Sequence, residues 1–330
     1  MIRKNIVSGT GVDKQSQQIT LPALREYAEF INSSDTALRM GLNHDRTLPP
    51  VGKVISGELI PYDGKVLLEA TIDDFIEEFE RCIGPNGEPL YRGKSTVDSR
   101  PFAGEKASSD AQLMLKINPI HFTQEEFSDV TEYLQSQCNI KVDTTFEKGI
   151  EPTIQLVFLF AHGLIAILSS KTKERAARKL SDEIANDIAK MYTKLKDAIV
   201  YVTKKIASIY KKDFIFVEPG QPVEFVVRAK TANEVLDAFV QLRAFDFVSV
   251  VEQFKHYTND NIDKIQFLFD DVDTTWKMTY LTTKDGQVIG KEATYKKAVK
   301  IYQEIMECPT AGFSIAGTAT YNDSECRDNA

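Results

Sequence analysis

The feature that most constrains the fold is a pair of strand-like runs, residues 52–59 and 65–71, on either side of Asp63 and Gly64. An Asp-Gly pair between such runs is typical of a two-residue β-hairpin, because both turn residues must adopt positive φ angles. The sequence therefore predicts a hairpin at this point and a small β-unit around it.

A short polar segment stands directly before this hairpin. It contains His44, one of only 4 histidines, with Asn43, Asp45 and Arg46 beside it. A neutral imidazole near pH 7 can accept a proton and later return it, so His44 is a candidate general base. In the alternative interpretation, Asn and Asp side chains hydrogen-bond the local backbone and His44 closes a turn. The residues themselves leave both interpretations open.

Length and composition narrow the class of protein. A chain of 330 residues, 42% hydrophobic and 27% charged, has the composition of a globular protein and a length that suggests about two domains. Its net charge of -8 argues against nucleic acid as a partner, since phosphate binding requires clustered Lys and Arg. The 4 cysteines are widely spaced and match no zinc motif. We expect free thiols, no metal, no cofactor and a cytoplasmic location.

Two further segments bear on the membrane question. The apolar run 154–168 covers about 15 residues, whereas a membrane-spanning helix needs about 20. We expect a buried strand leading into a helix, with His162 buried, and the first residues lack the apolar core of a signal peptide. Residues 171–212 repeat apolar positions every three or four residues and are rich in Lys. This pattern predicts one long amphipathic helix, or two, with solvated lysines; a membrane-surface or partner-binding role is the alternative.

The order of elements predicts an α+β fold. Helices are expected from Pro22, over residues 73–83 and from Thr123, where Glu126 completes a capping box. A polar stretch then separates this part from a region of alternating strands and helices. We predict a small N-terminal β-barrel with helices, a separate α/β domain that contains the long amphipathic helix, and a flexible tail; their ranges are 1–140, 151–308 and 309–330.

The residues around His44 and the order of elements resemble the phage prohead (capsid-maturation) serine proteases, which share a fold with the herpesvirus assemblins. The resemblance covers about residues 5–135, and the segment Asn43-His44-Asp45 is its most specific part. The other matching residues are Asp13, Ile19, Leu21, Pro22, Pro50, Gly52, Lys53, Val54, Asp63, Gly64, Leu67, Leu68, Ala70, Ile72 and the run Arg92-Gly93-Lys94-Ser95.

This resemblance implies a site and an activity. It assigns His44 as general base and Ser95 as nucleophile, and either Asp110 or His121 as the group that orients the histidine. The family has a glycine shortly after its serine, whereas this chain continues Thr96-Val97-Asp98, and Ser99 is therefore a rival nucleophile.

Two functions follow as expectations. The first is a phage-related serine endopeptidase that cleaves a protein substrate. The second is a catalytically inactive, protease-like module that binds a protein partner or supports assembly, in a phage or phage-defence setting. Neither needs a membrane, and self-association into a homo-oligomer stays open. The sequence does not indicate a role for residues 151–308.

Overall fold

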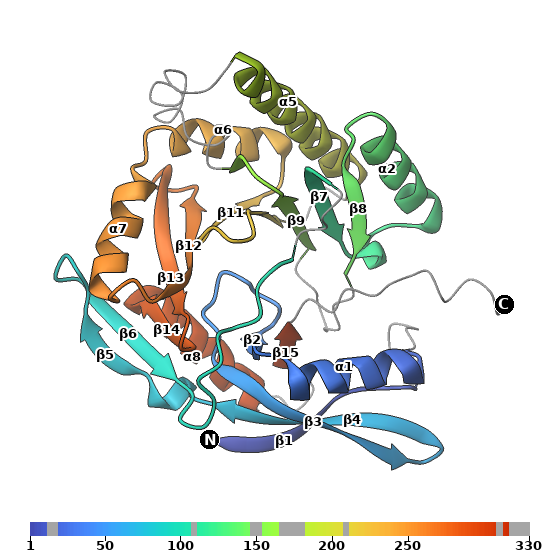
Figure 1. Ribbon diagram of the computed structural model, residues 1–330, viewed down its shortest axis with the longest axis vertical. Helices are drawn as coiled ribbons and strands as arrows, with labels where there is room; N and C mark the ends of the chain where they lie inside the picture. The colour runs from blue at the N-terminus through green and yellow to red at the C-terminus, as the bar shows by residue number, and fades with distance from the viewer. Residues whose placement is uncertain are drawn as a thin grey trace.

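The computed structural model describes residues 1–11, 19–106, 111–145, 154–164, 182–206, 211–307 and 313–316. These residues form two β-sheets with helices packed against both, which confirms the mixed α and β class (Figure 1). The small sheet has five strands and the large sheet has ten.

The small sheet is antiparallel and contains the predicted hairpin. Asp63 and Gly64 both have positive φ angles, 47° and 70°, as a two-residue turn requires. Helix α1 (Leu21–Ser33) packs on this sheet and begins at Thr20, whose hydroxyl accepts a hydrogen bond from the Ala23 amide. In sheet order the strands are β1 (Ile2–Gly9), β4 (Lys65–Asp74), β3 (Gly52–Tyr62), β2 (Leu38–Leu42) and β15 (Phe313–Ala316).

The large sheet is mixed and takes its strands from most of the chain. Its central strands are almost fully buried, and successive side chains point to opposite faces, so that apolar clusters form on both faces of the sheet. In sheet order they are β5 (Glu80–Ile83), β6 (Pro89–Lys94), β14 (Gln287–Lys291), β13 (Thr275–Thr283), β12 (Ile262–Asp270), β11 (Val223–Ala229), β10 (Lys212–Val217), β9 (Ile154–Phe160), β7 (Leu113–Ile117) and β8 (Lys141–Thr144).

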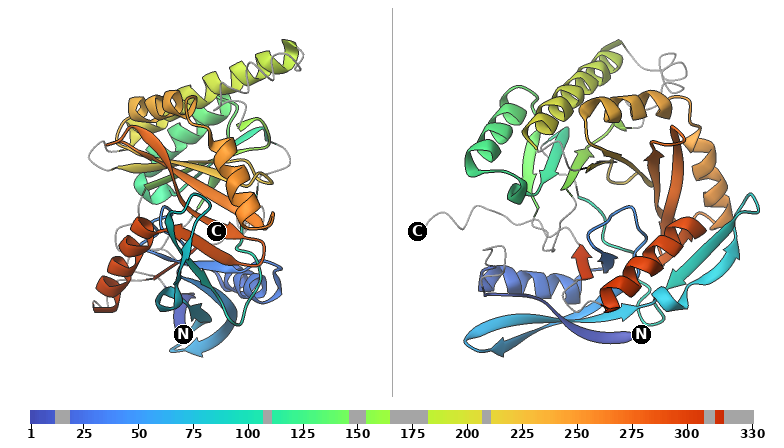
Figure 2. Two further views of the ribbon diagram at one scale, coloured as in Figure 1. Left: turned by 90° about the vertical axis from the view of Figure 1, so that its left-hand side faces the viewer. Right: turned by 180° about the vertical axis from the view of Figure 1, so that it is seen from behind.

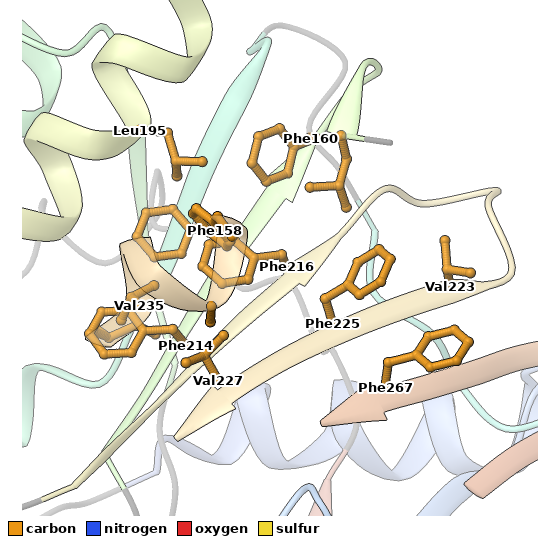
Figure 3. Packing of buried hydrophobic residues seen from close by; sticks show 14 of the residues in the cluster. Phe158, Phe160, Leu195, Phe214, Phe216, Val223, Phe225, Val227, Val235 and Phe267 are labelled. Atoms are coloured by element: carbon orange, nitrogen blue, oxygen red, sulfur yellow. The ribbon is translucent and has the colours of Figure 1, made fainter. Parts of the chain in front are cut away.

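Four helices cover one face of the large sheet, and the main hydrophobic core lies beneath them. Figure 3 shows Phe158 and Phe216 of neighbouring strands packed below Leu195, and their rings stack with centroids 5.3 Å apart. Aromatic side chains dominate because each buries a large apolar area. The four helices are α2 (Gln124–Ser136), α5 (Asp182–Lys205), α6 (Ala232–Leu242) and α7 (Phe247–Tyr257).

The opposite face of the large sheet is turned toward the small sheet. Helix α8 (Glu292–Glu307) follows β14 directly and contributes Ala298, Tyr302 and Ile305 to the core of the small sheet. Figure 2 shows α8 beside the small sheet, with the four covering helices on the far side of the large one.

One predicted helix is wrong. Residues 73–83 were expected to be helical because acidic residues precede an apolar repeat, but β4 runs on to Asp74, a single 3-10 turn η1 covers Ile76–Glu78, and β5 follows. Strand β5 pairs antiparallel with β6 across the tight turn at Gly87, whose φ is 81°. The partner strand decides the conformation, because local helix propensity is weak compared with sheet pairing and packing.

The predicted boundary near residues 140–151 does not coincide with a break in the sheet. Strand β7 lies before the boundary and pairs antiparallel with β9 after it, and β6 pairs with β14. Three strands of the predicted N-terminal domain, β5, β6 and β7, thus belong to the large sheet. Within the predicted tail 309–330, residues 313–316 form β15, and the other tail residues lie outside the described residues.

Of the other predictions for this half of the chain, one is confirmed and one is wrong. The long amphipathic helix is confirmed over 182–205, and the preceding residues 165–181 lie outside the described residues. His162 was predicted to be buried and is exposed, because β9 ends at Phe160 and the chain turns out of the core. In the described part of the chain, no helix is long and apolar enough to cross a membrane.

Candidate functional site

The connection between β2 and β3 carries His44 and has an unusual backbone. Asn43 and His44 have positive φ angles of 49° and 54°, a region that few residues other than glycine adopt. The Asp45 amide donates to the Leu42 carbonyl at 2.9 Å, and an Asp45 carboxylate oxygen accepts the Thr47 amide at 3.0 Å. These bonds form a local turn of the kind that the alternative interpretation of this segment predicts.

This connection lies against the face of the large sheet that carries Gln155, Glu224 and Arg228. His44 is half-buried, and its carbonyl accepts a hydrogen bond from the Gln155 side chain of β9 at 2.5 Å. The next two residues, Asp45 and Arg46, each belong to a series of alternating positive and negative side chains that extends onto the sheet. We call these series the Asp45 row and the Arg46 row.

The Asp45 row has four members and ends in the sheet. Lys297 of α8 contacts Asp45 at 3.0 Å, and Asp45 accepts from Arg228 of β11 at 2.8 Å. Arg228 also donates twice, at 2.7 Å each, to Asp213, which is its direct neighbour on β10 and is fully buried. A forked guanidinium is suited to bridging two carboxylates in this way.

The Arg46 row has five members and is more deeply buried. Arg46 is 8% exposed and donates to Glu224 at 2.6 Å and to Glu105 at 2.7 Å. Lys116 of β7 contacts Glu105 at 3.2 Å, and Lys264 of β12 contacts Glu224 at 3.5 Å. Each charge thus has an opposite charge beside it, which a buried ion needs in order to offset its lost hydration.

The two rows also fix the protonation of their acids. Burial alone opposes ionisation of Asp45, but Arg228 and Lys297 together hold its pKa well below the ordinary value. The same balance applies to Glu224, whose pKa is lowered by Arg46 and Lys264 against the effect of burial. Both carboxylates are therefore ionised at neutral pH and clamp the β2–β3 connection to the sheet.

Ser95 lies elsewhere, just after β6, and closes a turn. Its hydroxyl donates to a carboxylate oxygen of Asp73 at 2.6 Å and accepts the amides of Val97 at 3.2 Å and Asp98 at 2.9 Å. Ser99 is exposed. The described partners of the Ser95 hydroxyl do not include His44, and the pairing of these two residues stays a prediction.

The two candidates for orienting the histidine are Asp110 and His121. Asp110 lies outside the described residues. His121 ends the 3-10 turn η2 (Pro119–His121) after β7, where burial lowers its pKa. Its Nε2 atom is buried and has no hydrogen-bond partner among the residues that the structure describes.

Lys53 is a site residue whose burial the sequence did not predict. Its side chain lies in the interior, donates to the carbonyls of Asp98 (2.8 Å) and Arg100, and stands 5.0 Å from the centre of the Phe102 ring. Burial lowers its pKa to about 8. A lysine in a strand is usually exposed, so its composition and position gave no sign of burial. Lys53 was noted only as one of the residues that match the prohead-protease resemblance.

Comparison of the chain with family models, with curated proteins and with solved structures found no match. Within the described ranges, no group of three or more His, Cys, Asp or Glu side chains could hold a metal ion. Cys82 and Cys138 are free thiols, as expected.

Proposed function

We propose that this chain is a non-catalytic module that binds a protein partner and whose small sheet is a protease-like half-barrel. The observation that carries the proposal is the Ser95 hydroxyl. Its proton is directed at Asp73, and its lone pairs receive the amides of Val97 and Asp98. A nucleophilic hydroxyl needs a base to take its proton and a free lone pair for attack. This hydroxyl serves as a turn closure instead.

The loop that carries His44 supports the same proposal. Ion pairs join Asp45 and Arg46 to strand β11 and to Glu105, so the loop is a structural joint between the sheets. A phage or phage-defence setting belongs to the proposal through the resemblance of the Asn43-His44-Asp45 segment. The partner is a protein, since the net charge of -8 disfavours nucleic acid.

A fluorophosphonate probe, which labels activated serines, tests the proposal on the full chain. We expect no labelling of the wild-type protein at a concentration that fully labels a known serine hydrolase. Wild-type labelling that disappears in both Ser95→Ala and His44→Ala, but persists in Ser99→Ala, would establish a peptidase-type site and overturn the proposal. Circular dichroism shows whether each variant is folded.

A further inference from the structure

The last described strand, β15, covers the outer edge of β2. The two pair antiparallel over four residues, with Phe313 opposite Leu42 and Ala316 opposite Arg39. Strand β15 stands at the end of the small sheet and has β2 as its only strand neighbour within the described residues. Figure 1 shows it beside β2, close to the centre of the molecule.

Strand β2 depends on β15 for much of its pairing. On its other side β2 pairs with β3 through Leu38, Arg39 and Met40 alone, so the strand pairing of Gly41 and Leu42 comes from β15. The side chains of Leu38, Met40 and Leu42 are buried in the core of the small sheet, among residues of α1, β3, β4 and α8. Without β15 a rigid strand would present unpaired amides and carbonyls, the feature that accepts an added strand.

The position of this edge relates it to the site. Leu42 is followed directly by Asn43 and His44, and the Leu42 carbonyl already accepts the Asp45 amide. A strand that lies along residues 39–42 therefore has one end beside the His44 loop. That loop is held in place by the Asp45 and Arg46 rows, so the edge is part of a preformed surface and needs little reorganisation to bind.

We propose that the β2 edge, residues 39–42, is the docking edge for an extended segment of a protein partner, and that β15 is its internal occupant. The inference rests on the proposed binding function and specifies the mode. The register of β15 defines the partner segment: four residues, antiparallel to β2, in which a larger apolar residue alternates with a small one, as in Phe-Ser-Ile-Ala. Affinity comes from the main-chain hydrogen bonds.

Because β15 belongs to the same chain, a partner segment must compete with it for the β2 edge. A segment of the same chain competes at an effective concentration that is on the order of 1 mM for short connections. A free peptide therefore binds the intact protein far more weakly than it binds the same edge when β15 is disabled, because its apparent affinity falls with the fraction of open edge.

The test uses the full chain with β15 disabled by prolines, which cannot donate to a strand ladder. The variant is Ser314→Pro with Ile315→Pro, and the matched control places the same change at Thr318→Pro with Ala319→Pro. The probe is a fluorescein-labelled peptide with the sequence of residues 311–319, measured by polarisation. We expect the β15 variant to bind at least about tenfold more tightly than the wild-type protein or the control, and a scrambled peptide not to bind.

Two results would overturn the inference. One is a folded β15 variant that binds the peptide no better than the wild-type protein. The other is a wild-type dimer in light scattering that the prolines abolish, because it would assign the edge to a second copy of the chain. Both readouts are independent of fluorophosphonate labelling, so failure here leaves the proposed lack of catalysis standing, and labelling at Ser95 leaves the edge standing.

Hydrogen exchange on the wild-type protein keeps the inference testable if the variant does not fold. We expect the amides of residues 313–316 to exchange at least about a hundredfold faster than those of β4, because an occupant that must leave opens locally. Excess peptide is expected to slow exchange at Gly41, whose neighbour Met40 directs its own carbonyl to the opposite side of β2. Amides of β15 as protected as those of β4 would contradict the inference.

Discussion

At the scale of single residues, Lys53 is packed closely against a turn of the large sheet. Its ammonium group lies against Gly286, in the turn between β13 and β14, where φ is 73°. A Cβ atom on Gly286 would stand 2.0 Å from the Lys53 nitrogen and 2.3 Å from the Arg100 carbonyl oxygen. The glycine is required for both its backbone conformation and the space it leaves.

We predict that Gly286→Ala destabilises the protein by about 2–4 kcal/mol. The strained φ and the displacement of a buried ammonium from its carbonyl acceptors each contribute. Urea denaturation measures the change. Gly290→Ala is the control, since its nearest neighbour would be 3.6 Å from the new Cβ atom, and we expect a change below about 1 kcal/mol. Equal effects of the two substitutions would contradict this account.

The sequence indicated some of the important residues but not their partners. The segment Asn43–Arg46 was identified from its composition, and the turn at Asn43 and His44 agrees with one of its two interpretations. The ion pairs of Asp45 and Arg46 could not be predicted, because their partners lie between 59 and 252 residues away. No local pattern encodes such distances, and a charged residue is most often exposed.

At the scale of elements, predictions succeeded where the signal was local. The hairpin at Asp63 and Gly64, helix α1 with Pro22 in its first turn, and the capping box of α2 depend on neighbouring residues only. The helix expected over 73–83 was wrong because the segment is divided between the end of β4, the 3-10 turn η1 and β5, and β5 pairs with β6, the next strand in the sequence. The sequence predicted alternating strands and helices after the boundary, but it did not predict β5, β8 or the order of the strands across the boundary.

The capping box of α2 gives a test at this scale. We predict that Thr123→Ala costs about 1 kcal/mol of stability, because it removes the acceptor for the Glu126 amide and one side of the reciprocal bond. Thr193→Ala is the control, since Thr193 is an exposed residue inside α5 and alanine has the higher helix propensity. Thermal unfolding checks both; a larger loss at Thr193 would contradict the prediction.

At the scale of the whole molecule, the two sheets are joined through the β2–β3 connection. The Asp45 row and the Arg46 row link this connection to four strands of the large sheet and to α8. A contact made of buried ion pairs is strong only while every member stays charged. The stability of the assembled molecule should therefore depend on pH in the acidic range.

We predict a specific pH dependence for Asp45→Asn. The folded-state pKa of Asp45 is depressed below its ordinary value of 3.8, so its charge contributes stability above about pH 4 and loses that contribution as the pH falls further. The variant should be less stable than the wild type by about 2 kcal/mol at pH 7, and this difference should shrink below pH 4.

Urea unfolding between pH 7 and pH 3 measures that difference. Glu26→Gln, an exposed position on α1, is the control and should give a small difference at every pH. A difference between wild type and Asp45→Asn that stays constant down to pH 3 would show that the charge of Asp45 does not stabilise the joint.

The strand order of the small sheet also bears on synthesis of the chain. Four of its strands lie within the first 74 residues, whereas the fifth is residues 313–316. The ribosome synthesises β15 more than two hundred residues after β4. The edge of β2 that pairs with β15 is therefore unpaired during most of translation. Strand margins left open during folding invite misassembly. Expression yield of this chain should therefore respond to translation speed and to chaperones that shield β2.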